Sequence, residues 1–163
     1  MVNSSTFHLN VMTGQGNLSH DPGDENFSAG KTETQPQRIL IAEDNEVIRE
    51  LAREILEFLD FDVHVAGNGA LALQLALRQT FDLILMDCQM PVLDGFEATR
   101  RLRLLESESG RNKTPIVALS GHPISEGREN CLAAGMDDYL QKPFTISELQ
   151  GIINNWIPAP PMQ

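Results

Sequence analysis

From Gln37 onward, short continuous apolar runs alternate with longer stretches in which apolar residues recur at helical spacing. This alternation predicts parallel β-strands joined by crossover helices, and therefore an α/β fold. Apolar runs without polar interruption are typical of strands that are covered on both faces of a sheet. The strands expected from these runs are residues 38–42, 61–65, 82–86, 115–119 and, more weakly, 139–141.

Five helices are expected between and after these strands, and several of their ends carry capping signals. Asn68 and Asp94 stand where an N-cap oxygen would begin the second and third helices, and Gly135 can take the left-handed conformation after the fourth. Thr145 and Glu148 have the spacing of a capping box at the start of the fifth helix. The expected helices are residues 46–59, 70–78, 96–106, 125–134 and 146–156.

The two ends of the chain lack these patterns. Residues 1–36 are rich in Ser, Thr, Asn, Gly and Gln, and this composition predicts a disordered tail or an interdomain linker. Residues 158–163 are expected to form a proline-rich C-terminal tail, because prolines stop regular structure. One folded domain over residues 37–157 is therefore expected, with no output domain after it.

The charge of the chain narrows the range of partners. Twelve Lys and Arg residues against 23 Asp and Glu residues give a net charge of -11. A protein this acidic repels phosphate backbones and anionic lipids, so neither nucleic acid nor a membrane surface is expected as a direct partner. No apolar run approaches the roughly 18 to 20 residues of a membrane span, and no signal peptide is recognisable. We therefore expect a cytoplasmic location.

Some reactive residues are expected to serve structure rather than chemistry. Cys88 and Cys131 are too few for a disulfide framework and lack the spacing of a metal site, so both are expected as reduced thiols in the core. Asp137 and Asp138 fall in the turn after Gly135 and are expected as solvent-exposed charges. The chemistry must come from elsewhere in the chain.

Three carboxylates are expected to meet at one edge of the sheet. In an open doubly wound sheet with strand order 2-1-3-4-5, ligands bind at the carboxyl ends of the first and third strands. Glu43 and Asp44 follow the first strand, and Asp87 ends the third. Each like-charged pair at about 4 Å costs on the order of 4 kcal/mol at an effective dielectric constant near 20. Such a cluster needs a cation.

Two cations are compatible with this cluster. Mg²⁺ prefers carboxylate and carbonyl oxygens, and the backbone carbonyl of Gln89 could supply one ligand beside Asp87. Lys142 follows the weak fifth strand at the same edge, and the hydroxyl group of Ser120 ends the fourth strand. Glu43 and Asp44 suit metal binding, Asp44 directly and Glu43 through water.

This set of residues suits phosphoryl transfer to Asp87. The carboxylate would attack in line, the metal would neutralise charge on the phosphoryl oxygens, and Lys142 and Ser120 would hold the remaining oxygens. The product would be an acyl phosphate.

Four motifs give the chain a resemblance to a known family. RILIAEDN, LILMDCQMPVLDG, PIVALSG and YLQKPF occur in the order and spacing of the receiver domain of two-component response regulators. The resemblance, over residues 38–157, implies a (βα)5 flavodoxin-like fold, a three-layer sandwich with Asp87 as phosphoacceptor and Mg²⁺ as cofactor. It also implies Ser120 as the switch hydroxyl, Tyr139 as a rotating aromatic, Lys142 as the phosphate-contacting lysine and a cis peptide bond before Pro143.

The resemblance further implies partners and a setting. In the family the phosphoryl group comes from a phosphohistidine on a histidine kinase or a histidine phosphotransfer domain. A receiver that ends its chain after a long linker resembles the C-terminal receiver of a hybrid sensor kinase, whose own kinase core would be a partner. Such a parent kinase could be membrane-anchored elsewhere in its chain. Ser120-Gly121 replaces the Thr-Ala pair of many members, and a looser switch is expected.

Other functions remain open at this stage. The chain could be a stand-alone single-domain response regulator, or a pseudo-receiver that serves only as an interaction module. A Mg²⁺-dependent aspartyl-phosphate phosphatase would favour a second Asp where Gln89 stands, and a flavin or nucleotide binder would not place acids in the loop after the first strand. We expect a phosphoacceptor that catalyses only its own phosphorylation and dephosphorylation, and therefore not an enzyme acting on other molecules.

The first helix carries more apolar surface than one sheet contact needs. Its apolar residues, Val47 to Leu59, span an arc of about 180°, against the roughly 100° stripe that covers a sheet face. The excess indicates either lateral packing against the fifth helix or a docking surface for a phosphotransfer or dimerisation helix.

Overall fold

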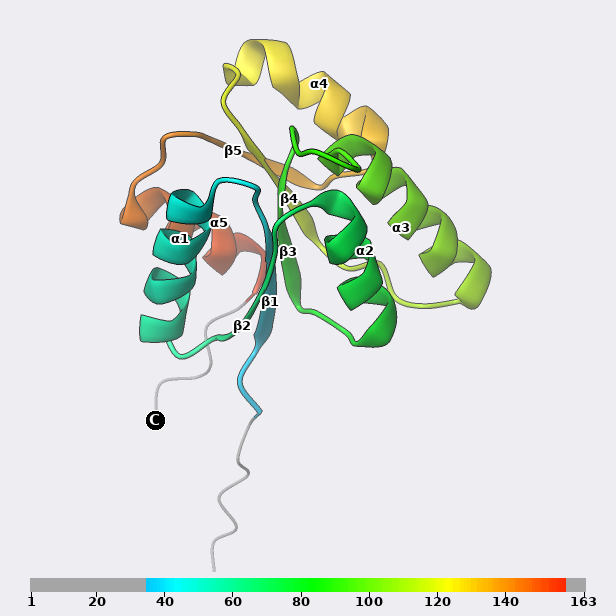
Figure 1. Cartoon of the computed structure of the whole chain (residues 1–163), viewed down its shortest axis with the longest axis horizontal. Coiled ribbons are helices and arrows are strands. Elements are labelled where there is room, and N and C mark those ends of the chain that lie inside the picture. Colours follow the sequence, from blue (N-terminus) through cyan, green and yellow to red (C-terminus); the bar gives the residue numbers. More distant parts are fainter. Residues whose placement is uncertain (1–34, 158–163) are drawn as a thin grey trace, which may run out of the picture. The chain divides into compact units, whose positions relative to one another are not determined.

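The computed structural model describes residues 35–157, and in this part of the chain five parallel strands form one sheet in the order β2-β1-β3-β4-β5. Figure 1 shows the sheet running through the middle of the domain with helices on both faces. The α/β fold and the strand order expected from the sequence are confirmed. The strands are β1 (Arg38–Ala42), β2 (Asp62–Ala66), β3 (Leu83–Asp87), β4 (Ile116–Ser120) and β5 (Asp138–Gln141).

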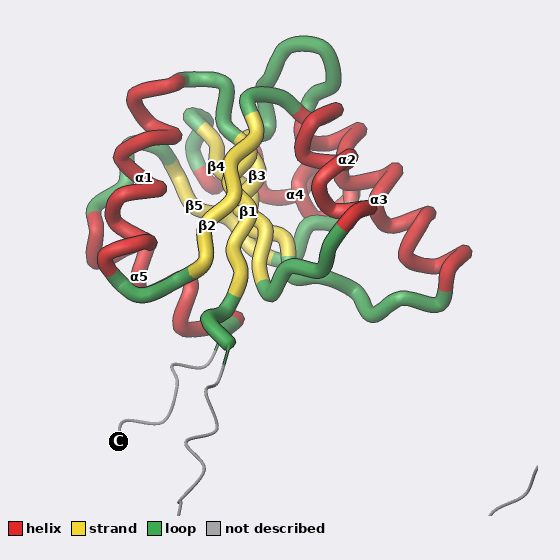
Figure 2. The backbone as a smooth tube through the Cα atoms, turned by 60° about the horizontal axis from the view of Figure 1, so that its bottom comes forward, coloured by secondary structure: helices red, strands yellow, loops and turns green. Residues whose placement is uncertain are grey.

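The helices divide into two layers, so the domain is the three-layer sandwich that was expected. Figure 2 shows α1 and α5 on one face of the sheet and α2, α3 and α4 on the other. Each face buries its own apolar cluster, with Leu56 and Ile153 on the first side and Ala72 and Leu102 on the second. The helices are α1 (Glu46–Phe58), α2 (Gly69–Arg78), α3 (Gly95–Ser109), α4 (Ile124–Ala134) and α5 (Ile146–Trp156).

The capping predictions are confirmed, and the helix bounds agree within one residue except at the end of α3. Asn68 and Asp94 accept backbone N–H groups at the starts of α2 and α3, and Thr145 and Glu148 form the capping box of α5. Helix α3 continues to Ser109 instead of ending at residue 106, and Gly110 closes it in the left-handed conformation.

The carboxylate of Glu106, in the last turns of α3, is buried and belongs to a polar network. Arg103 lies at the centre of this network, with Nη1 donating to Glu106 Oε2 over 2.7 Å and Nη2 donating to Asp137 Oδ2 over 2.7 Å. Its Nε also donates to the carbonyl oxygen of Gly135 over 2.8 Å. The network thus ties α3 to the turn between α4 and β5.

The expectation that Asp137 and Asp138 are solvent-exposed charges was wrong. Asp137 pairs with Arg103 and also accepts the backbone N–H of Ile116 over 2.9 Å. Asp138 accepts the indole N–H of Trp156 over 3.0 Å. Both carboxylates tie the start of β5 to distant segments of the chain.

The predicted tails, residues 1–36 and 158–163, lie almost wholly outside the described residues, and their assignment stays a prediction. Within the described part of the chain, no helix has the length and apolar character that crossing a bilayer requires.

Candidate functional site

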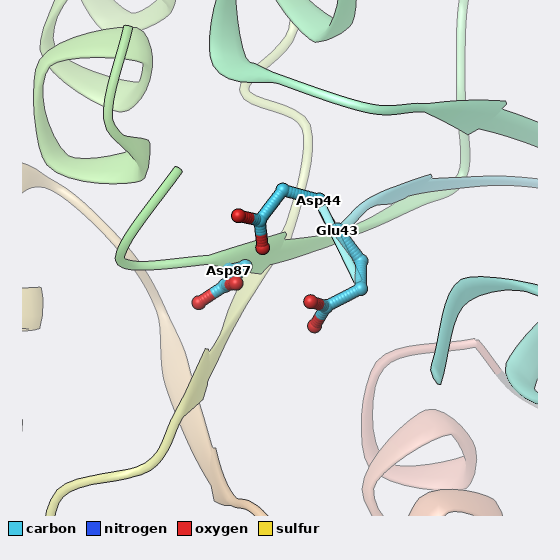
Figure 3. A group of neighbouring side chains, drawn as sticks. All are labelled: Glu43, Asp44 and Asp87. Atoms are coloured by element: carbon cyan, nitrogen blue, oxygen red, sulfur yellow. The ribbon is translucent and has the colours of Figure 1, made fainter. Parts of the chain in front are cut away.

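The three expected carboxylates meet at the carboxyl edge of the sheet. Ala42 in β1 is aligned with Met86 in β3, so Glu43 and Asp87 follow at equivalent positions of neighbouring strands. Glu43, Asp44 and Asp87 each place a carboxylate oxygen within 4.8 Å of the others. Figure 3 shows these three side chains converging on one region. The sequence-based placement of the acidic cluster is therefore confirmed.

Lys142 lies between two of these acids. Its Nζ atom is 3.0 Å from Glu43 Oε2 and 3.0 Å from Asp87 Oδ2. Burial opposes the charge of the lysine, but its hydrogen bonds to both carboxylates are stronger in sum and raise the pKa of Lys142. Glu43 is 0% exposed. Burial raises the pKa of Glu43, and the hydrogen bond from Lys142 offsets part of this effect.

The remaining oxygens of the cluster fit a hard divalent cation. Glu43 Oε1 accepts the N–H of Asn45 and Asp87 Oδ1 accepts the N–H of Gln89, each over 3.0 Å. The carboxylate of Asp44 is exposed and has no hydrogen bond or ion pair with any residue that the structure describes. One ammonium group faces three carboxylates, so negative charge remains to be neutralised. An oxygen-rich site of this kind suits Mg²⁺, which would be held by Asp44 and Asp87 with Glu43 behind them.

The loop after Asp87 is shaped by two unusual backbone positions. Leu93 donates its N–H to the carbonyl oxygen of Pro91 over 2.8 Å, and Val92 between them has φ of 70°. Such a tight turn is strained for a β-branched residue. Gly95 packs so closely under this loop that an added Cβ would lie 2.0 Å from the carbonyl oxygen of Asp87. Glycine is therefore required there for Asp87 to keep its position.

Gln89 lies at the start of this loop and is exposed to solvent. It lines a surface depression together with Asp44, Met90 and Phe96. The expected use of the Gln89 carbonyl as a metal ligand stays a prediction.

Ser120 and Tyr139 are linked through the backbone of one residue. Ser120 Oγ accepts the N–H of His122 over 3.2 Å, and the hydroxyl group of Tyr139 donates to the carbonyl oxygen of His122. Ser120 also accepts the backbone N–H of Lys142 at its own carbonyl over 2.7 Å. The expected cis peptide bond between Lys142 and Pro143 is present. The sequence identified Ser120 and Tyr139 but not the link through His122, because the backbone of His122 rather than its side chain makes it.

Residues 39–154 match the family "Response regulator receiver domain". The chain belongs to this family. The resemblance that the four motifs indicated is thereby confirmed, over most of the chain, and the fold observed here is that of a receiver domain.

Individual relatives agree with this assignment. Hybrid signal transduction histidine kinase A of Dictyostelium discoideum is 38% identical over 121 residues, which are 74% of this chain and 6% of that protein. The chain thus spans only a small part of this curated relative. The receiver domain of sensor histidine kinase PA1611 of Pseudomonas aeruginosa, with a magnesium ion in its active site cleft, is 45% identical. That match has a TM-score of 0.67 and covers 74% of this chain and 97% of the other.

A further solved structure includes a partner. The receiver domain of Ssk1 from Saccharomyces cerevisiae, crystallised with the histidine phosphotransfer protein Ypd1, is 29% identical to this chain. The TM-score is 0.72, and the match covers 75% of this chain and 89% of the other.

Proposed function

We propose that this receiver domain accepts a phosphoryl group on Asp87 from a phosphohistidine, with Mg²⁺ as cofactor, in a His-to-Asp phosphorelay. The observation that carries the proposal is the convergence of Asp87 with Glu43, Asp44 and Lys142 at one edge of the sheet. Gln89, an exposed amide, cannot serve as the acid that a phosphatase acting on other molecules would need there. The domain therefore acts chemically only on itself.

The transfer is an in-line displacement at phosphorus. A carboxylate oxygen of Asp87 forms the new O–P bond, the N–P bond to the donor histidine breaks, and the imidazole nitrogen keeps the electron pair and takes up a proton. Mg²⁺ neutralises charge on the phosphoryl oxygens when bound. Lys142 already contacts Asp87 and holds one phosphoryl oxygen, and the Ser120 hydroxyl turns to donate to another. The Ser120 and Tyr139 hydroxyl groups both bond to the backbone of His122, which connects the ring to the site.

The donor is a histidine kinase or a histidine phosphotransfer domain that docks on α1. Phe58 is 87% exposed and Val47 77% exposed, although both belong to the apolar arc of this helix. Leu51, Phe58 and Ile146 line an apolar groove between α1 and α5. Thus the arc both packs beside α5 and leaves apolar surface free.

Two observations support a phosphotransfer partner for this surface. The surface begins close to the acidic cluster along the chain, since α1 begins two residues after Asp44 and α5 four residues after Lys142. A helix lying in the groove would therefore bring its histidine to Asp87. The complex of Ypd1 with the Ssk1 receiver is an example of such a partner meeting a receiver domain.

The setting that we propose is the receiver of a hybrid sensor histidine kinase in the cytoplasm. Support comes from the hybrid kinase of Dictyostelium discoideum, in which the matching region is one small part of a long chain. The parent kinase core would then be one of the phosphate donors.

Incubation with Mg²⁺ and a small acyl phosphate tests the function. Intact mass spectrometry should detect one added phosphoryl group, labile to acid and base, which the Asp87→Asn variant lacks. Asp94→Asn is the matched control, because Asp94 lies in the same loop and asparagine serves equally well as the N-cap of α3. Incorporation into Asp87→Asn, or none into the parent protein, would overturn the proposal.

A further inference from the structure

Helix α4 contains a glycine that its own backbone does not require. Gly127 lies inside the helix and makes the regular bond from its N–H to the carbonyl oxygen of Pro123 over 3.1 Å. It is absent from the described residues with positive φ, so no left-handed conformation explains it. Glycine inside a helix is unfavourable relative to alanine. Its presence therefore needs a reason outside the helix.

The space beside Gly127 is occupied by one aromatic ring. A Cβ added to Gly127 would lie 3.1 Å from both Cε2 and the hydroxyl oxygen of Tyr139, and 3.5 Å from Cζ. These three atoms of Tyr139 are the nearest that such a Cβ would meet. A Cβ at position 127 would thus press against the ring and require the ring or α4 to shift by a few tenths of an ångström.

Tyr139 occupies this space in its inward position. The side chain is 7% exposed, and its hydroxyl group donates to His122 at the end of the loop that precedes α4. The hydroxyl end of the ring makes this bond and also lies beside Gly127. A ring turned outward would lose both contacts.

We propose that Gly127 is a positioning residue that admits Tyr139 to its inward position and so sets how much of the inward form is populated. The inference rests on the proposed function for its biological meaning, since the inward ring is bonded through His122 to Ser120. The placement of the ring itself does not depend on phosphorylation. The role of Gly127 and the proposed phosphoacceptor function can therefore be tested separately.

The test uses Tyr139 as its own probe, because it is the single tyrosine of the chain. The full chain carrying ¹³C-labelled tyrosine is compared with Gly127→Ala and with the control Gly151→Ala, without a phosphate donor. Gly151 is also inside a helix, but an added Cβ there meets nothing within 4 Å. Relaxation caused by a soluble gadolinium chelate measures the exposure of the ring.

In Gly127→Ala, we expect the shielded form of the ring to fall roughly tenfold relative to the exposed form, because overpacking has a substantial cost. The parent protein and Gly151→Ala should keep a shielded ring. A ring that stays shielded in a folded Gly127→Ala variant overturns the proposal, because α4 has then moved aside instead. Absence of phosphate on Asp87 in the parent protein would overturn the proposed function and leave this result standing.

A second measurement covers the case in which Gly127→Ala folds poorly. In a Tyr139→Ala background the ring is gone, so Gly127→Ala should raise the melting temperature as Gly151→Ala does. In the parent background the gain should be smaller or reversed. Equal effects of Gly127→Ala in both backgrounds would show that the ring and the glycine are independent, and would overturn the proposal.

Discussion

The ammonium nitrogen of Lys142 lies 3.0 Å from a carboxylate oxygen of Asp87, so the proposed phosphoacceptor already has a cationic partner. The same nitrogen contacts Glu43. In a Lys142→Met variant the two acids lose this charge, and we expect Mg²⁺ to bind several-fold more tightly because the site is more negative. Isothermal titration with Mg²⁺ measures the change. Unchanged or weaker binding would mean that the lysine does not compete electrostatically with the metal.

Substitution of Asp44 and of Glu43 should weaken Mg²⁺ binding to different extents. Asp44 is exposed and unpaired among the described residues, so Asp44→Asn should weaken Mg²⁺ binding roughly tenfold or more and leave thermal stability nearly unchanged. Glu43→Gln should weaken Mg²⁺ binding less, because a fully buried residue hydrogen-bonded to Lys142 acts from behind the metal. Titration and melting curves of the two variants give the comparison. The reverse order would assign the direct ligand to Glu43.

The exposed apolar surface of α1 predicts a selective defect. Phe58→Ala should reduce phosphoryl transfer from a histidine phosphotransfer protein roughly tenfold or more, since an aromatic anchor at an interface contributes strongly to binding. Phosphorylation by a small acyl phosphate should be unaffected, because that donor does not dock. Leu104→Ala is the control, as Leu104 is an exposed apolar residue on α3. An equal loss with both donors would point to a folding defect.

The Arg103 network should dominate the stability of the edge opposite the acidic site. Arg103→Met leaves the carboxylates of Glu106, 5% exposed, and Asp137 without their shared partner, and removing one member of a buried ion pair costs about 3 to 5 kcal/mol. Arg100→Ala, which breaks an exposed pair with Glu97, should cost far less, because solvent screens surface charges. Urea unfolding gives both values. Similar values for the two variants would mean that the buried pairs contribute no more than surface pairs.

The two thiols should be unreactive in the folded protein. Cys88 and Cys131 are buried with their sulfur atoms 3.6 Å apart, and burial raises the pKa of both thiols. Burial therefore disfavours the reactive thiolate in the folded state, and labelling with a thiol reagent should wait for unfolding. The labelling rate with increasing urea, followed by mass spectrometry, tests this. Rapid labelling of the folded protein would contradict the buried positions of the sulfur atoms.

The acidic cluster could be predicted from the sequence because it depends only on where the strands end and on β1 and β3 being neighbours. All strands of a parallel sheet reach the same edge, so Glu43, Asp44 and Asp87 had to meet once their strands were recognised. The polar network around Arg103 could not, because Asp137 lies 34 residues away in sequence and only the packing of α3 against the turn brings it near. Asp137 follows the end of α4, where acids are usually exposed, and its pairing with Arg103 was therefore missed.

Contacts made by backbone atoms were the other feature that the sequence did not predict. Asn45 caps α1 by accepting the N–H groups of Val47 and Ile48, a cap whose signal stood in the sequence but was read only as part of the acidic motif. The link from Ser120 to Tyr139 passes through the peptide groups of His122, which any residue type could provide. A side-chain pattern cannot reveal a contact of this kind.

Trp156, at the end of α5, can report on the conformation of β5 by its fluorescence. It is the single tryptophan of the chain, and its indole donates to Asp138, the residue that precedes Tyr139 on β5. Indole emission changes when such a bond lengthens or breaks. Movements of the β5 edge can therefore be followed by intrinsic fluorescence, with no dye and no substitution, while phosphate donors or partner proteins that lack tryptophan are added.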